Sequence, residues 1–149
     1  MKKFIVFILL CVFLFTATLF KKEFSFQNMQ NLNVQVFTSI VDNKLNNYST
    51  VQNGQGQIVF CSYNEYQEIK KISNNICGVT FIFDGTENDF KNVIKDLKVK
   101  IIEQGDTNFV GYTNSFDSSV NYKNKKVNVQ GYYFNNRIYI GTPLLLGSY

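Results

Sequence analysis

The chain begins with an apolar segment that constrains everything after it. Residues 4–20 are uncharged and apolar, and a pair of lysines flanks this run on each side, at positions 2–3 and 21–22. As a helix, seventeen residues span about 26 Å, which is the lower end of the thickness of a bilayer core, and lysines at both ends can reach the interface. We therefore expect residues 1–22 to anchor the chain in a membrane.

A cleaved secretory signal is the main alternative to an anchor, and a buried helix of a soluble protein is a weaker one. The positive start and apolar core fit a signal peptide, but Ala17 is the one alanine, and bulky residues follow it where a cleavage site needs small ones. The amino-terminal end is the more positive, so the positive-inside rule places residues 23–149 outside the cytoplasm. The expected location is the cell membrane with a single pass, or the exterior if the segment is cleaved.

The remaining chain has the length of one domain. Residues 23–33 are polar with scattered apolar side chains, and we expect them to be a spacer. Residues 34–149 are long enough to bury a core, which predicts a single extracytoplasmic domain.

The charge of that domain argues against nucleic acid as a partner. The chain has 15 Lys and Arg against 11 Asp and Glu, a formal charge of +4, but the four lysines around the apolar run account for the whole excess. Residues 23–149 are therefore neutral, whereas nucleic-acid binders carry clustered positive charge. The cluster Lys123, Lys125 and Lys126 fits a solvated turn.

Periodicity in the domain predicts two helices. Apolar residues recur every three or four positions from Tyr66 to Ile72 and again from Phe90 to Leu97. Thr86, with Asp89 three residues later, forms a capping box before the second helix.

Strand patterns fill most of the remaining domain. They lie at residues 34–41, 58–61, 78–83, 99–103, 109–113, 127–133 and 137–141, and the first of them is also compatible with a short helix. Residues 46–57, with two glycines, predict a loop or hairpin turn, Asn135-Asn136 favours a tight hairpin, and Pro143 ends the last strand. These elements together predict an α+β fold, a two-layer domain whose mostly antiparallel sheet is covered by two helices and preceded by one N-terminal transmembrane helix.

The cysteines and the lack of histidine limit the chemistry. Two buried free thiols are the interpretation we favour for Cys61 and Cys77, and a disulfide outside the cytoplasm is the alternative. The sequence contains no His, which excludes Ser-His and Cys-His nucleophile pairs and the common zinc sites. We predict no catalytic residues, no metal site and no cofactor.

The C-terminal part resembles a known family. Three successive features carry the resemblance: residues Lys125 to Gln130, a short strand pair, and the end of the chain from Gly141-Thr142-Pro143 to Tyr149. Together they resemble the tail of the YwmB family of exported proteins from Firmicutes. The resemblance covers about forty residues. It implies a fold similar to the TATA-box-binding protein, a curved antiparallel sheet backed by helices, and it implies little about activity.

Three hypotheses about function follow from the sequence. The first is a non-catalytic, membrane-anchored domain that binds a protein or cell-envelope partner, with Tyr132, Tyr133, Phe134 and Tyr139 as the candidate interaction surface. Packing in the core or on a second sheet face explains the same aromatics. The second is a structural, self-assembling envelope component. The third is an envelope hydrolase with paired carboxylates, although each carboxylate also fits a helix start, a turn or a strand end.

Overall fold

The computed structural model describes residues 24–143 and residue 145. The predicted anchor, residues 1–22, lies outside this part of the chain. Within the described residues, no helix combines the length and the apolar character needed to cross a membrane.

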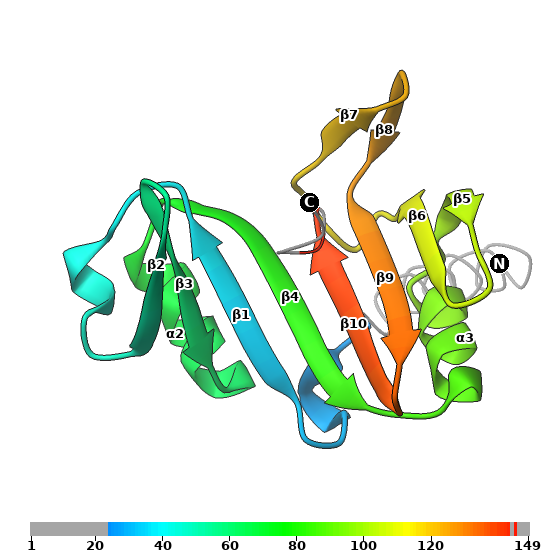
Figure 1. The fold of residues 1–149 in the computed structure, drawn as a ribbon, viewed down its shortest axis with the longest axis horizontal. Coiled ribbons are helices and arrows are strands. Elements are labelled where there is room, and N and C mark those ends of the chain that lie inside the picture. The colour runs from blue at the N-terminus through cyan, green and yellow to red at the C-terminus, as the bar shows by residue number, and fades with distance from the viewer. Residues whose placement is uncertain (1–23, 144, 146–149) are drawn as a thin grey trace, which may run out of the picture.

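A long antiparallel sheet dominates the fold (Figure 1). Its eight strands lie in the order β2-β3-β1-β4-β10-β9-β6-β5, and a separate hairpin of β7 and β8 projects from it. The strands of the large sheet are β1 (Asn33–Thr38), β2 (Ser49–Asn53), β3 (Gly56–Cys61), β4 (Ile76–Asp84), β5 (Lys100–Gln104), β6 (Asn108–Tyr112), β9 (Val129–Phe134) and β10 (Arg137–Thr142). The hairpin strands are β7 (Val120–Tyr122) and β8 (Lys125–Val127).

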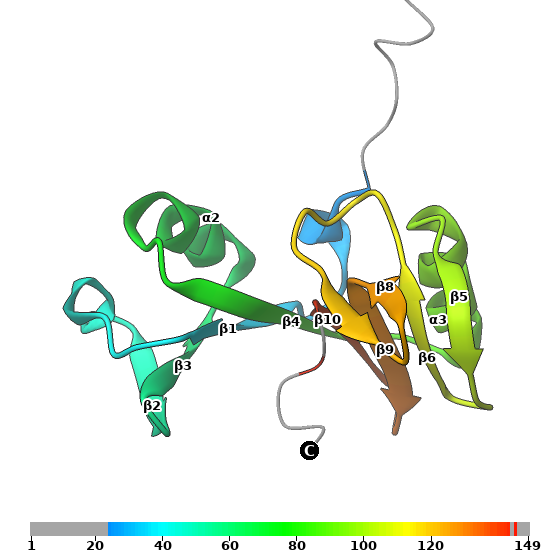
Figure 2. The same ribbon diagram turned by 90° about the horizontal axis from the view of Figure 1, so that it is seen from above.

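Two helices lie on one face of the sheet (Figure 2). Helix α2 (Tyr63–Ile72) connects β3 to β4, which flank β1 and both run antiparallel to it, so the connection crosses over β1. Helix α3 (Glu87–Asp96) connects β4 to β5 at the far edge of the sheet. Two short 3-10 turns, η1 (Phe26–Asn28) and η2 (Asn43–Leu45), complete the described elements.

The helix starts follow their local sequence. Thr86 and Asp89 form the predicted capping box, in which each side chain bonds the other residue's backbone N–H. Ser62 and Glu65 form the equivalent pair at the start of α2. The predicted Asn135-Asn136 hairpin is also confirmed, since both residues have positive φ between β9 and β10.

The core lies between the helices and the sheet face that they cover. Cross-strand pairs such as Val34 with Phe81 and Ile138 with Phe83 place buried side chains on this face. Phe90 of α3 packs on Phe109, with ring centroids 5.7 Å apart. The hydrophobic core of the described residues is therefore built on this face of the sheet.

The predicted α+β two-layer domain is wrong, because the protein is mostly β. Each helix has ten residues, about 15 Å of length, and a diameter of roughly 10 Å. Eight strands spaced about 4.8 Å apart make a sheet almost 40 Å wide, which two such helices cover only in part. The sequence analysis also missed β2, which has only one large apolar residue, Val51, and was expected to be part of a loop.

The expected spacer, residues 23–33, contributes to the folded domain over its described part. Phe26 is 4% exposed and its ring stacks on that of Phe81, with centroids 4.0 Å apart. Phe24, Met29 and Leu32 also pack against the core. These contacts attach the start of the described chain to the centre of the helix-covered face.

Candidate functional site

The four aromatics of the predicted interaction surface do not share one face. Tyr132 and Tyr139 stack with ring centroids 4.2 Å apart, and Phe134, two residues along β9 from Tyr132, is 61% exposed. These three lie on the open face, away from the helices. Tyr133 lies on the helix-covered face, where its ring stacks near Phe90 at 6.4 Å.

The open face carries further apolar residues. Cross-strand pairing aligns Ile82 with Tyr139, and Phe37 and Val51 with Ile58. Leu145 is buried on this side, with its backbone N–H donating to the Gln130 side chain at 3.3 Å. The open face is thus partly apolar, and nothing in the described residues indicates what else covers it.

The two cysteines are free thiols that lie far apart on the sheet. Cys61 pairs with Val34 on one side of β1, whereas Gly78, next to Cys77, pairs with Phe37 on the other side. The two cysteines are separated by two strand spacings across the sheet and by about three residues along the strands. Each of these separations exceeds the distance of about 7 Å between Cα atoms that a disulfide allows. The structure therefore does not bring the predicted pair together.

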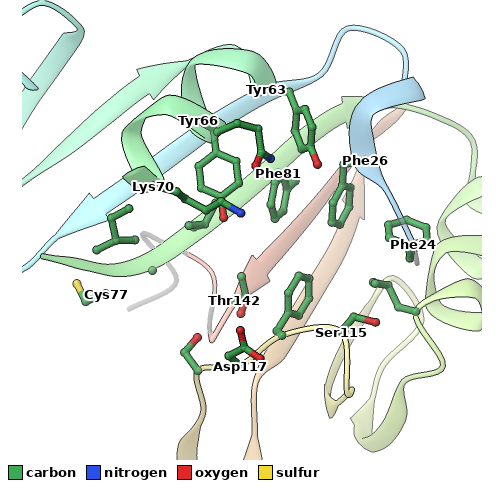
Figure 3. A pocket seen from close by; sticks show the side chains of 17 residues that line it. Phe24, Phe26, Tyr63, Tyr66, Lys70, Cys77, Phe81, Ser115, Asp117 and Thr142 are labelled. Carbon is green, nitrogen blue, oxygen red and sulfur yellow. The ribbon is translucent and has the colours of Figure 1, made fainter. Parts of the chain in front are cut away.

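A pocket on the helix-covered face brings aromatic, charged and hydroxyl side chains together (Figure 3). Its volume is about 420 Å³, within the usual range of ligand sites. Tyr63, Tyr66 and Lys70 of α2 form one side, and Ser115 and Asp117 lie on the opposite side. We call it the aromatic pocket, because its lining includes the rings of Phe24, Phe26, Tyr63, Tyr66, Phe81 and Phe116.

The rings of the aromatic pocket form one connected cluster. Tyr66 meets Phe81 edge-on with centroids 5.6 Å apart, and Phe26 lies parallel to Phe116 at 6.5 Å. Burial raises the pKa of Tyr66 to about 12, so its hydroxyl stays neutral at any physiological pH. The Lys70 ammonium lies 5.1 Å from the centre of the same ring. The pocket therefore offers an apolar, aromatic interior with a cation at its edge.

The sheet is interrupted beside this pocket. Strand β10 ends at Thr142, which pairs with Val79, and Pro143 follows. The start of β4, from Ile76 to Gly78, extends beyond that end, and no described strand pairs with it on the β10 side. Cys77 is the extra residue of a bulge against β1, because Phe37 pairs with Gly78 and Thr38 with Ile76. Bulges of this kind commonly lie next to binding sites.

A buried hydroxyl marks the base of the interruption. Thr142 is 8% exposed and lines the aromatic pocket, and its Oγ1 has no hydrogen-bond partner among the described residues. A buried polar atom without a partner costs about 1–3 kcal/mol, so native structures rarely contain one. Such an atom at a pocket wall is a natural contact for a bound polar group.

The loop opposite α2 is held by a buried asparagine. Asn128 is fully buried; its side-chain oxygen accepts from the Thr113 N–H at 2.8 Å, and its amide donates to the carbonyls of Thr113 and Phe116 at 2.7 and 2.8 Å. The Thr113 hydroxyl donates to the carbonyl of Leu97. These bonds fix the position of residues 115–118 at the pocket.

Sequence reasoning missed this site for a physical reason. Its lining comes from six separate stretches of chain, residues 24–26, 63–70, 76–81, 97, 115–118 and 142. Tyr66 lies in the apolar stripe that was expected to pack in the core, and Phe116 lies in a stretch with no periodic pattern. The unusual density of aromatics was the one available signal.

The described residues contain no group of three or more His, Cys, Asp and Glu side chains close enough to hold a metal ion.

Asp42 is the one buried acidic residue in the described part of the chain, and the Ser73 hydroxyl donates a hydrogen bond to its carboxylate at 2.7 Å. That hydrogen bond, together with the Lys44 backbone N–H, lowers its pKa. Asp42 thus ties the loop after β1 to the end of α2.

Comparison with known proteins gives no match. No family model, no curated protein and no solved structure is significantly similar to the chain.

Proposed function

We propose that this protein is a non-catalytic, membrane-anchored extracytoplasmic domain that binds an extended peptide segment of a protein partner in its aromatic pocket. One observation carries the proposal: the aromatic pocket adjoins a stretch of strand, Ile76–Gly78, that is unpaired on one side among the described residues. An extended peptide needs both features, because its side chains require pockets and its backbone requires hydrogen bonds.

The rings support the capture of a bulky apolar side chain. Aromatic rings prefer offset-stacked or edge-to-face partners, and the lining rings already meet in both ways, since Phe26 stacks on Phe81 and Tyr66 meets Phe81 edge-on. An inserted Phe, Tyr, Leu or Ile side chain would replace water against these rings. Burial of such a side chain contributes roughly 1.5–3 kcal/mol.

The polar groups support an ordered peptide backbone. Among residues 24–143 and 145, no strand pairs with Ile76–Gly78 on the β10 side and no group bonds the Thr142 hydroxyl, so both can bond a strand that continues in the place where β10 ends. Lys70 and Asp117 lie on opposite sides of the pocket, so charged residues of the peptide would fix its direction.

The position of Phe24 supports a partner at the membrane surface. Phe24 lines the aromatic pocket, and it follows the end of the apolar run, Phe20, by four residues. Four extended residues span about 14 Å. If residues 4–20 cross the membrane, the pocket lies near the bilayer, where another membrane or envelope protein supplies the peptide.

Selection from a random decapeptide library tests this function. The full chain in lipid nanodiscs is the bait, and we expect enriched peptides to share one bulky apolar residue in an extended, Pro-free context. Ser118→Trp places a large side chain at the pocket without removing a core contact. We expect this variant to weaken the binding of these peptides at least tenfold, which is about 1.4 kcal/mol of binding free energy.

Asn92→Trp on the exposed surface of α3 is the matched control and should bind as the natural chain does. Bound peptide should also slow alkylation of Cys77, which lines the pocket and is exposed. Enrichment of no peptide, or equal binding by both Trp variants, would reject the proposal.

A further inference from the structure

The two edges of the large sheet differ in how they are protected against pairing. The β5 edge has a register shift between Ile101 and Glu103, and it carries charge at Lys100 and Glu103. Lys123, from the β7–β8 turn, also forms an ion pair with Glu103. Irregularity and charge are the usual means by which proteins prevent strand edges from pairing with other chains.

The β2 edge has none of these protections. Its register with β3 is regular over Ser49–Asn53, all five residues are exposed, and the strand contains no proline. No charged residue occurs anywhere from Leu45 to Asn64. An uncharged, regular and exposed edge is a template for an added strand.

The hairpin geometry shows which backbone groups are free on this edge. The β2–β3 loop has two residues, Gly54 and Gln55, and Gly54 has φ +61°. In a two-residue hairpin the flanking pair, here Asn53 and Gly56, exchanges both backbone hydrogen bonds, and the pattern then alternates. Ser49, Val51 and Asn53 therefore bond to β3, and the N–H and C=O groups of Thr50 and Gln52 point outward.

We propose that β2 pairs antiparallel with β2 of a second copy of this chain, about a two-fold axis at Val51. The sequence of the strand is self-complementary in this register. Thr50 of one copy lies opposite Gln52 of the other, and their outward backbone groups make two hydrogen bonds at each of the two equivalent pairs. No like charges meet, because the strand has none.

The side chains on the open face favour the same partner. Val51 is 55% exposed and Phe60, on the neighbouring strand, is 40% exposed. Val51 pairs with Ile58 and shares its face with Phe60. The two-fold axis brings Val51 against Val51 of the second copy, in line with Ile58 of each chain, which buries apolar surface that a monomer leaves in water. The site is separate from the aromatic pocket, whose lining includes no residue of β2.

Position-specific crosslinking tests the register. Val51 faces Val51 as a non-hydrogen-bonded pair with Cα atoms about 4.5 Å apart, which a disulfide can bridge. In the full chain with Cys11→Ser and Cys77→Ser, we expect Val51→Cys to form a disulfide-linked dimer under mild oxidation. Asn53→Cys is the control, because Asn53 lies opposite Ser49 and should crosslink at least tenfold more slowly.

Sedimentation of the full chain in mild detergent tests the dimer itself. We expect Val51→Lys to raise the dimer dissociation constant at least about tenfold, since two ammonium groups would meet at the axis. Ile101→Lys on the exposed β5 edge is the matched control and should leave the dimer unchanged. A monomer at every concentration, a dimer that survives Val51→Lys, or equal crosslinking at positions 51 and 53 in folded protein would overturn the proposal.

Discussion

At the scale of single residues, Asn128 connects the fold to the candidate site. Its side-chain amide makes three hydrogen bonds with backbone groups of Thr113 and Phe116, and they hold this part of the chain in place. We expect Asn128→Ala to lower the free energy of unfolding by about 3 kcal/mol, because it leaves buried backbone groups without partners. Urea denaturation measures this change. Asn121→Ala, at an exposed position, should change it by less than about 0.5 kcal/mol, and equal effects would refute the structural role.

The two thiols differ at the same scale. Burial raises the pKa of Cys61 to about 12, and its Sγ contacts the carbonyl of Val34, whereas Cys77 is exposed. Since the thiolate is the reactive form, we expect iodoacetamide at pH 8 to modify Cys77 at least about a hundred times faster than Cys61 in folded protein. Mass spectrometry of the modified peptides measures both rates. If both thiols resist modification until a reductant is added, they form the disulfide that the sequence analysis gave as the alternative.

At the scale of elements, the helix caps make a prediction that depends on pH. Thr86→Ala removes one half of the α3 capping box and should lower the free energy of unfolding by about 1 kcal/mol at neutral pH. The backbone N–H and then the hydroxyl of Thr86 lower the pKa of Asp89 below its ordinary value. A carboxyl whose pKa is lower in the folded state stabilises the fold above its unfolded pKa and loses that contribution as the pH falls through the folded value.

The difference in the free energy of unfolding between the natural chain and Thr86→Ala should therefore shrink as the pH falls below about 4. Urea denaturation over pH 2.5 to 7 tests this, with Thr107→Ala in an exposed turn as the control. A difference that is independent of pH would contradict the ionised capping box.

Elements with strong local signals were predictable from the sequence, and the others were not. The two helices, the strand at 78–83 and the Asn-Asn hairpin have periodicity, caps or turn residues that specify them locally. β2 has no such signal, since its five residues are mostly polar and it is a strand because β3 pairs with it. Sheet width also depends on pairing between distant segments, so the balance between sheet and helices was misjudged.

At the scale of the whole molecule, the sheet separates two surfaces that carry different side chains. The helix-covered face holds the core and the aromatic pocket, and the first described residues join it at Phe24 and Phe26. The open face holds Tyr132, Phe134 and Tyr139, which the sequence predicted as an interaction surface. The pocket could not be predicted, because only the fold brings its six stretches of chain together.

Hydrogen–deuterium exchange of the full chain, with and without a peptide from the library selection, tests the central claim most directly. If the peptide extends the sheet at the end of β10, the amides of Ile76–Gly78 should exchange at least about tenfold more slowly in the complex, together with those of residues 115–118. Exchange at β2 should not change. Protection confined to the open face or to β2, with no change at residues 76–78, would contradict peptide binding in the aromatic pocket.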